Sequence, residues 1–196
     1  MDESGLRAGP RRKIPIRRCG AFDEIYAAYH VRLFNFLARL SRSRDLAEDL
    51  VEETWLRLVS QSGRLRDDTH LAAWLFTVAR NLYISSCRSR LLEQSHAADL
   101  ISLWPTGAAA PSPFDETAAN EADRRLEGAL AALPKPHREV LLLVGVEGLT
   151  PAEAAVVCGV SPDALRQRLR RARSGLASRL DALEAAPATA PQEAVP

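Results

Sequence analysis

The chain has 196 residues, with 26 Lys and Arg side chains against 25 Asp and Glu, so its formal net charge is +1. An apolar fraction of 46% is ordinary for a globular protein and argues against wholesale disorder. The longest apolar run, residues 140–146, is far shorter than the roughly 20 residues that a membrane helix needs, so we expect no membrane insertion. The basic N-terminus lacks the apolar core of a secretory signal, and Cys19, Cys87 and Cys158 form no disulfide or metal pattern, which indicates the cytoplasm.

The near-zero net charge hides a segregation of charge along the chain. Residues 1–19 carry +4, residues 91–120 carry −4 and residues 162–180 carry +5, and such blocks create local fields that select local partners. Apolar residues recur at helical spacing, with no convincing alternating segment, so we expect an all-α fold. It would have two small helical domains joined by a flexible linker, the second with a helix-turn-helix. The expected segments are a basic flexible arm (1–19), a first domain (20–90), a linker (91–120), a second domain (121–181) and a disordered tail (182–196).

Two helices are expected at the start of the first domain, over residues 22–40 and 45–60. On the second, six residues share an apolar arc: Leu46, Leu50, Val51, Thr54, Trp55 and Leu58. The opposite arc holds five carboxylates and a leucine: Asp45, Glu48, Asp49, Glu52, Glu53 and Leu56. Carboxylates on one face repel each other. This pattern fits a solvated face near a helix N-terminus or a docking face for a basic partner. Taken alone, the pattern favours the solvated face.

A loop over residues 62–70 leads to a third helix, over 71–90. Its expected buried stripe contains Leu71, Trp74, Leu75, Val78, Ala79 and Leu82. The exposed arc would hold Arg80, Asn81, Tyr83, Ile84, Cys87 and Arg88. Arginine, asparagine and tyrosine together can serve phosphates, base edges and base stacking, although an ordinary amphipathic helix explains the same pattern. The Ala/Pro-rich segment 91–120 has no Lys or Arg and is typical of a linker.

The strongest local signal lies in the second domain, after a helix expected over 137–146. The sequence TPAE at 150–153 is typical of a capping box with proline at the first helical position. A turn at Gly159 and a cap at Ser161 follow, which together give helix-turn-helix spacing. The second of these helices exposes Arg166, Gln167, Arg170, Arg171 and Arg173. This layout suits a DNA recognition helix; the alternative is a basic surface helix of any bundle.

Three stretches together resemble the extracytoplasmic-function sigma factors of bacterial RNA polymerase. Residues 44–59, RDLAEDLVEETWLRLV, resemble region 2.2 of that family, which binds the clamp helices of the polymerase β′ subunit. Residues 70–90, HLAAWLFTVARNLYISSCRSR, resemble regions 2.3 and 2.4, which melt and read the −10 element. Residues 133–180 resemble region 4, which reads the −35 element in the major groove. The resemblance implies a sigma factor that directs promoter-specific initiation, without catalysis or a cofactor of its own.

The resemblance also implies a role for individual residues. The polymerase-binding residues would be Asp45, Glu48, Asp49, Glu52, Glu53 and Leu56. The −10 residues would be Arg64, Arg66, Arg80, Asn81, Tyr83 and Arg88, with loop 62–70 receiving a flipped base. The −35 residues would be Ser161, Asp163, Ala164, Arg166, Gln167, Arg170, Arg171 and Arg173. The implied partners are core RNA polymerase, through its β′ clamp helices and β flap, duplex and melted promoter DNA, and the anti-sigma factor that holds many family members inactive.

Four residues depart from the family pattern. Glu52 stands where glutamine is frequent, Ser85 where an aspartate is usual, and Asp163-Ala164 where Gly-Thr is common. We therefore expect unusual details of −10 and −35 recognition.

Three other functions are weighed against a sigma factor. A helix-turn-helix regulator not associated with core polymerase explains the second domain but leaves the acidic helix without a role. A sigma-mimicking protein that binds only an anti-sigma factor usually carries a receiver domain, for which this chain is too short. An enzyme is disfavoured because the four histidines are scattered and no phosphate loop, nucleophile elbow or metal spacing occurs.

Overall fold

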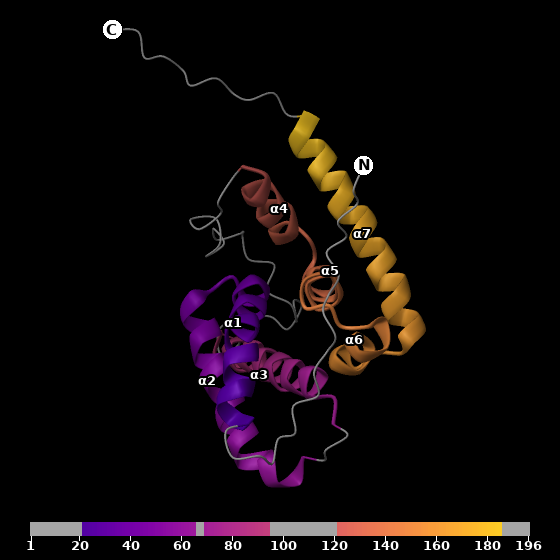
Figure 1. Ribbon diagram of the computed structural model, residues 1–196. Helices are drawn as coiled ribbons and strands as arrows, with labels where there is room; N and C mark the ends of the chain where they lie inside the picture. The colour runs from indigo at the N-terminus through magenta and orange to yellow at the C-terminus, as the bar shows by residue number, and fades with distance from the viewer. Residues whose placement is uncertain (1–20, 66–68, 95–120, 186–196) are drawn as a thin grey trace, which may run out of the picture.

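The computed structural model describes residues 21–65, 69–94 and 121–185, and every regular element within these ranges is helical (Figure 1). The first group of helices comprises α1 (Ala21–Ser41), α2 (Arg44–Gln61), the 3₁₀ turn η1 (Ser62–Arg64) and α3 (Leu71–Gln94). The second comprises α4 (Glu121–Ala131), α5 (Lys135–Leu141), the π-helical turn η2 (Leu142–Val146), α6 (Pro151–Cys158) and α7 (Pro162–Ala185). The all-α expectation is confirmed. The expected arm, nearly all of the linker and most of the tail lie outside the described residues.

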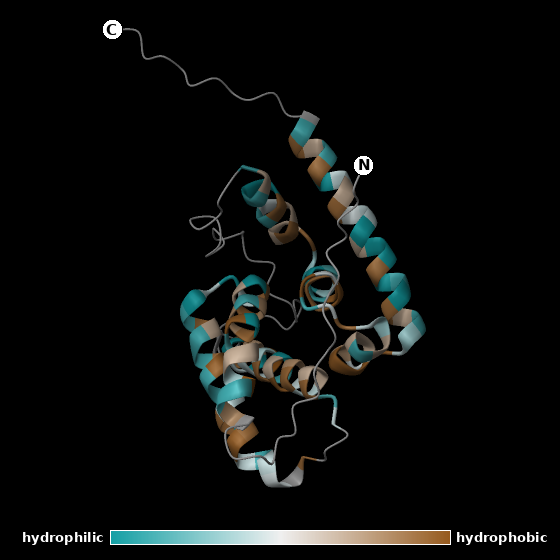
Figure 2. Cartoon of the chain, in the orientation of Figure 1, coloured by the Kyte–Doolittle hydropathy of each residue, from teal (hydrophilic) through white to brown (hydrophobic). Residues whose placement is uncertain are grey.

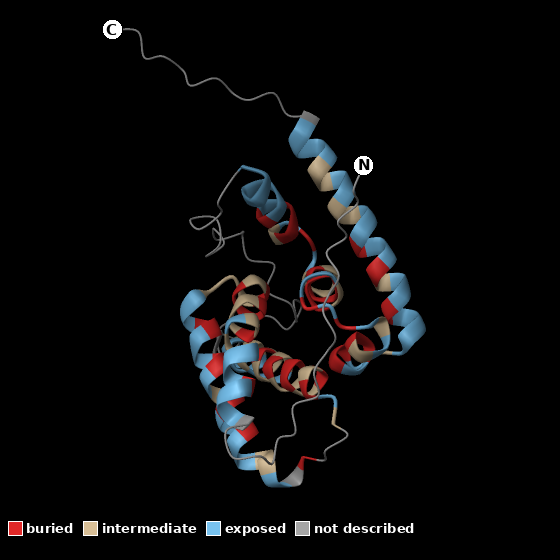
Figure 3. Cartoon of the chain, viewed as in Figure 1, coloured by how far each residue is buried: buried red, intermediate tan, exposed pale blue. Residues whose placement is uncertain are grey.

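Helices α1, α2 and α3 pack on one another around an apolar core. Phe36 of α1 and Phe76 of α3 are fully buried and meet edge to face, with ring centroids 5.2 Å apart, a favourable arrangement for aromatic pairs. All six residues of the apolar arc expected for α2 are buried; Figure 2 colours the helices by hydropathy and Figure 3 by burial. The helical spacing of the sequence therefore predicted the inner face of α2 correctly.

The helix-turn-helix expected from the sequence is formed by α6 and α7. Thr150 and Glu153 form the capping box, in which the Thr150 side chain accepts from Glu153 N at 3.2 Å and Thr150 N donates to the Glu153 carboxylate at 2.7 Å. Gly159 ends α6 with φ 65°, a left-handed conformation that costs glycine little. Ser161 begins α7, because its hydroxyl accepts from Ala164 N at 3.2 Å.

Helix α7 runs along one side of the molecule, with α4, α5 and α6 packed against it (Figure 1). Leu165, Leu169 and Ala172 face inward and are buried. Before α6, the helix widens into a π turn, where Glu147 N donates to Leu142 O, five residues earlier, at 2.8 Å. The sequence predicted a helix through residue 146 but not this change in its pitch.

Helix α3 corrects one expectation. Tyr83, expected on the exposed arc, is only 4% exposed, and its hydroxyl donates to Leu40 O of α1 at 3.4 Å. Phe76 and Ala73, which the expected stripe omitted, are also buried. The reason is that α3 packs against α1 and α2 and also against α6, so it buries more of its surface than a helix with one covered face.

The two groups of helices share one connected cluster of buried apolar residues. Arg138 of α5 lies between them and is 5% exposed. Its guanidinium donates to Leu130 O at 3.0 Å and Leu133 O at 3.1 Å, satisfying carbonyls at and after the end of α4, and to Arg39 O of α1 at 3.3 Å. Burial lowers the pKa of Arg138, and the nearby charge of Arg42 lowers it further. None of the helices in the described ranges is long and apolar enough to cross a membrane.

Candidate protein and nucleic-acid interfaces

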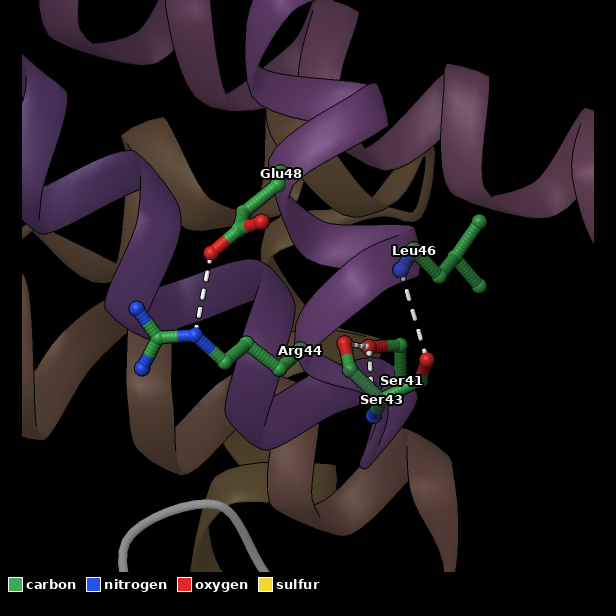
Figure 4. A network of polar contacts seen from close by, with 5 residues as sticks. All are labelled: Ser41, Ser43, Arg44, Leu46 and Glu48. Carbon is green, nitrogen blue, oxygen red and sulfur yellow. Dashed lines mark hydrogen bonds and ion pairs between the residues drawn. The ribbon is translucent and has the colours of Figure 1, made fainter.

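The start of α2 is fixed by two serines, Ser41 at the end of α1 and Ser43 in the turn that follows (Figure 4). The Ser43 hydroxyl accepts from Leu46 N at 3.3 Å, and Ser43 N donates to the Ser41 hydroxyl at 3.2 Å. This cap satisfies a backbone donor that the first turn of a helix leaves free. It also sets where α2 begins, and thereby which side chains face the core and which face solvent.

The expected acidic face of α2 lies on the surface. Its members are Asp45, Glu48, Asp49, Glu52 and Leu56, which are exposed, and Glu53, which is half-buried. Two of the carboxylates are paired one turn away, Glu48 with Arg44 at 3.0 Å and Glu53 with Arg57 at 2.8 Å. Within the described part of the chain no cation pairs with Asp45, Asp49 or Glu52. The face therefore combines partly neutralised acids with three that are free.

Apolar side chains adjoin this acidic face. Leu56 is 64% exposed and Val59 58% exposed on α2, and Val31 is 62% exposed on α1. A hollow of about 310 Å³ lies between the two helices, lined by Val31, Phe34 and the acidic Glu48 and Glu52 among others. Exposed apolar groups that cluster beside charges are typical of protein-docking surfaces.

The solvent face of α7 is basic. Every side chain of the expected −35 set is exposed: Ser161, Asp163, Ala164, Arg166, Gln167, Arg170, Arg171 and Arg173. Asp163 and Arg166 form an ion pair within the first turns of the helix. For the three later arginines the described residues provide no carboxylate partner, so their charge is directed to solvent.

The electrostatic influence of α7 reaches His137 of α5. Burial lowers the pKa of His137, and the positive charges of Arg168, Arg171 and Arg179 lower it further. Charges that disfavour an imidazolium in this way attract anions. The surface of α7 thus has the sign and the exposure that a polyanion requires.

The expected −10 residues are brought together only in part. Asn81 and Arg88 are exposed on α3. The Arg80 side chain is only 16% exposed, because its Nε donates to Glu139 Oε1 of α5 at 2.5 Å. Tyr83 is buried, with Lys135 Nζ of α5 5.6 Å from the centre of its ring. The side chain of Arg64 and all of Arg66 lie outside the described residues.

The Arg80–Glu139 ion pair joins the two groups of helices, and two arginines of α1 form ion pairs of the same kind. Arg32 of α1 donates to Glu147 at 2.9 Å, and Arg39 of α1 lies 2.7 Å from Glu127 of α4. Sequence reasoning missed these partners, which stand 88 to 115 positions apart. For Glu139, the partner of Arg80, one signal was available: Arg138 and Glu139 directly precede the apolar run 140–146, and charged groups that become buried beside such a run need partners.

The described residues offer no cluster of metal-ligating side chains. They contain no group of three His, Cys, Asp or Glu side chains that could hold an ion. Burial raises the pKa of Cys158 to about 12, so its thiol stays protonated and unreactive at neutral pH.

Comparison with known proteins identifies the two groups of helices. Residues 25–91 match sigma-70 region 2, and residues 123–176 match sigma-70 region 4. The chain is 36% identical over 162 residues to the ECF RNA polymerase sigma factor EcfG of Rhodopseudomonas palustris, covering 81% of this chain and 83% of that protein. It is 34% identical to the RNA polymerase sigma factor CarQ of Myxococcus xanthus, covering 84% and 91% of the two proteins.

The fold has a matching neighbour among solved structures. The sigma factor RpoE of Bartonella quintana, in complex with the anti-sigma factor NepR, superposes with a TM-score of 0.67 at 27% identity, covering 83% of this chain and 98% of that one. The family match, the relatives and the fold agree over the same two groups of helices. The chain belongs to the extracytoplasmic-function sigma factors, the subunits that associate with RNA polymerase and direct promoter-specific transcription.

Proposed function

We propose that this sigma factor uses three separate surfaces: the acidic face of α2 for core polymerase, the basic face of α7 for the −35 element, and α3 with the preceding loop for the melted −10 strand. The observation that carries the proposal is that α2 and α7 expose faces of opposite charge on opposite groups of helices. Core polymerase supplies the catalysis, and the protein works where that enzyme works, in the cytoplasm.

The α2 face suits a protein partner with basic side chains, and the family resemblance points to the β′ clamp helices. Asp49 and Glu52 present free carboxylates, and Leu56 beside them supplies an exposed apolar contact. Charged groups at a rim give specificity and fast association, whereas buried apolar anchors hold the complex. A second polymerase contact, to the β flap, is expected from the family.

The α7 face suits duplex DNA. In a helix-turn-helix the N-terminal residues of the second helix reach base edges in the major groove. Arg166 and Gln167 occupy that position, and arginine and glutamine can each make two hydrogen bonds to one base. Arg170, Arg171 and Arg173 lie further along the exposed face, where they can neutralise phosphates and displace counterions.

The third surface is supported by α3. Asn81 and Arg88 are exposed and can contact base edges and phosphates of a single strand. Arg80 joins them only when it leaves Glu139. Since RpoE of Bartonella quintana was solved with an anti-sigma factor, we also propose that a protein of this kind restrains the present chain.

The proposal is tested by binding measurements with the full chain. Purified core polymerase is mixed with the protein, and the complex is separated by size-exclusion chromatography. We expect co-elution with core and, in a separate titration, binding of duplex DNA that weakens steeply with salt concentration. DNA binding without any co-elution with core would replace this proposal with a helix-turn-helix regulator that works without polymerase.

A further inference from the structure

One ion pair lies at the end of α7 that is assigned to DNA bases. Arg166 Nη2 donates to Asp163 Oδ1 across one turn of the helix. Both side chains are exposed, Arg166 by 61% and Asp163 by 83%. Arg170, Arg171 and Arg173 lie on the same exposed face and have no carboxylate partner in the part of the chain that the structure describes. Among the arginines of this face, Arg166 is therefore the one whose guanidinium is held by a neighbour.

The Asp163 carboxylate is available to Arg166 because another residue caps the helix. The first turn of α7 is capped by Ser161, whose hydroxyl accepts from Ala164 N at 3.2 Å. A carboxylate in this turn is favourable to the helix dipole by itself, and an ion pair this exposed adds little further stability. Asp163 also stands where glycine is common in the family. The pair is thus a feature of this chain, and its main consequence is where it holds Arg166.

The position of this guanidinium matters because a free arginine beside DNA has a competing partner. It can swing to a phosphate, a contact that carries no sequence information. The Asp163 carboxylate opposes that movement, because it attracts the guanidinium and repels phosphates. The ion pair engages one guanidinium nitrogen and leaves donors for two hydrogen bonds to one base. Guanine is the base that presents two acceptors, N7 and O6, side by side in the major groove.

We propose that Asp163 is a positioning residue for recognition of the −35 element: it holds Arg166 for a bidentate contact with a guanine and keeps it from phosphates. This inference rests on the proposed function of α7 as the reader of duplex DNA. Asp163 itself contacts no base and acts on specificity only through Arg166. It therefore lowers the affinity for DNA of arbitrary sequence while it raises the preference for guanine at one position.

A small set of variants separates this role from a direct contact with DNA. Asp163→Ala releases Arg166, whereas Asp163→Glu keeps a carboxylate at the same position. Arg166→Ala removes the group that reads the base. The matched control is Asp181→Ala, which removes the same charge from an exposed position about 27 Å further along α7.

The test compares two duplexes that differ at one atom of one base. A preferred duplex is selected from a randomised library with the full wild-type chain, and the guanine that Arg166→Ala no longer selects is replaced by 7-deazaguanine, which lacks the N7 acceptor. Both duplexes are titrated by fluorescence anisotropy. We expect this replacement to weaken binding of the wild type about tenfold and of Asp163→Ala about twofold. Asp163→Glu should keep most of the wild-type ratio, and Asp163→Ala combined with Arg166→Ala should match Arg166→Ala alone.

A duplex of unrelated sequence gives a second readout. Asp163→Ala should bind it about threefold more tightly than the wild type, with a salt dependence steeper by about one counterion, because the released Arg166 reaches a phosphate. Asp181→Ala should change neither the guanine preference nor the salt dependence, since a charge so far from the contact is screened.

Three results would overturn the inference. They are an equal cost of 7-deazaguanine in the wild type and Asp163→Ala, a loss of preference in Asp163→Ala at a base pair that Arg166→Ala leaves unaffected, and the absence of guanine from the bases that depend on Arg166. If circular dichroism shows that Asp163→Ala does not fold, Asp163→Asn, which keeps the size of the side chain without its charge, decides in its place.

Failure of the inference is distinguishable from failure of the proposed function. A folded wild-type chain that selects no sequence at all would remove both the reading role of α7 and the inference. A chain that selects guanine through Arg166 equally well without Asp163 would keep the reading role of α7 and lose only the inference.

Discussion

Helices α2 and α7 expose faces of opposite charge, yet they differ in more than sign. On α2 two of the five carboxylates are paired with arginines one turn away, and apolar side chains such as Leu56 lie among the acids. On α7 the later arginines have no carboxylate partner among the described residues. Charge that is left unpaired acts at a distance and suits a polyanion. Charge mixed with apolar groups suits a protein interface, where contact rather than field strength decides affinity.

The largest effect is expected from reversing the α2 charges. In the double variant Asp49→Arg with Glu52→Arg, two exposed carboxylates become cations that face a basic partner, and like charges across an interface cost several kcal/mol. We expect polymerase-dependent transcription to fall by about 100-fold or more. Binding of duplex DNA by α7 should stay unchanged, which a DNA titration of the same variant checks. An equal loss of both activities would show that the two surfaces are not separate.

A smaller effect is expected at the start of α7. Replacing Arg166 or Gln167 by alanine should cost about 1–3 kcal/mol of binding and relax the preference for particular −35 bases. The matched control, Arg173→Ala, should weaken all sequences similarly and reduce the salt dependence of binding by about one counterion. Selection from a randomised duplex library measures both. Equal losses on every sequence for Gln167→Ala and Arg166→Ala would contradict their assignment to bases.

The sequence predicted α2 and α7 well for a physical reason. Each has one broad covered face, so helical periodicity alone separates buried from exposed positions. It failed on α3 because several helices cover that helix, and a contact between distant parts of the chain leaves no periodic trace. Tyr83 and Arg80 were placed in solvent for this reason: Leu40 of α1 and Lys135 of α5 lie against Tyr83, and Glu139 of α5 pairs with Arg80. The partners of Arg32 and Arg39 were likewise invisible, since a glutamate about 100 positions away carries no local signal.

The turn between α6 and α7 offers a test of stability. Gly159 has φ 65° and open space where a Cβ would stand, so Gly159→Ala introduces only backbone strain, which we expect to lower the free energy of unfolding by about 1–2 kcal/mol. Gly128 of α4 has the same open space but no positive φ. Gly128→Ala should therefore raise stability by roughly 0.5–1 kcal/mol through helix propensity. Urea unfolding measures both, and destabilisation of equal size would contradict the account of the turn.

The smallest effect is expected at a buried charge, in contrast to the exposed charges of α2 and α7. Burial raises the pKa of Glu147, although Arg32 opposes the shift. The folded protein then binds this proton more tightly than the unfolded chain, so the stabilising contribution of Glu147 grows as pH falls through its raised pKa and is lost as pH rises. Glu147→Gln should change stability at pH 7 by no more than about 1 kcal/mol. Relative to that variant, the wild type should gain stability on acidification in urea titrations at several pH values; a relative loss would contradict the shift.

The claim that the chain directs promoter-specific initiation is tested most directly by transcription in vitro. Core polymerase from the same bacterium transcribes fragmented genomic DNA with and without the full chain, and the 5′ ends of the transcripts are mapped. We expect new start sites that share two sequence elements at a fixed spacing, and their loss with Asp49→Arg and Glu52→Arg. Transcripts identical to those of core alone, from a folded protein, would contradict the account.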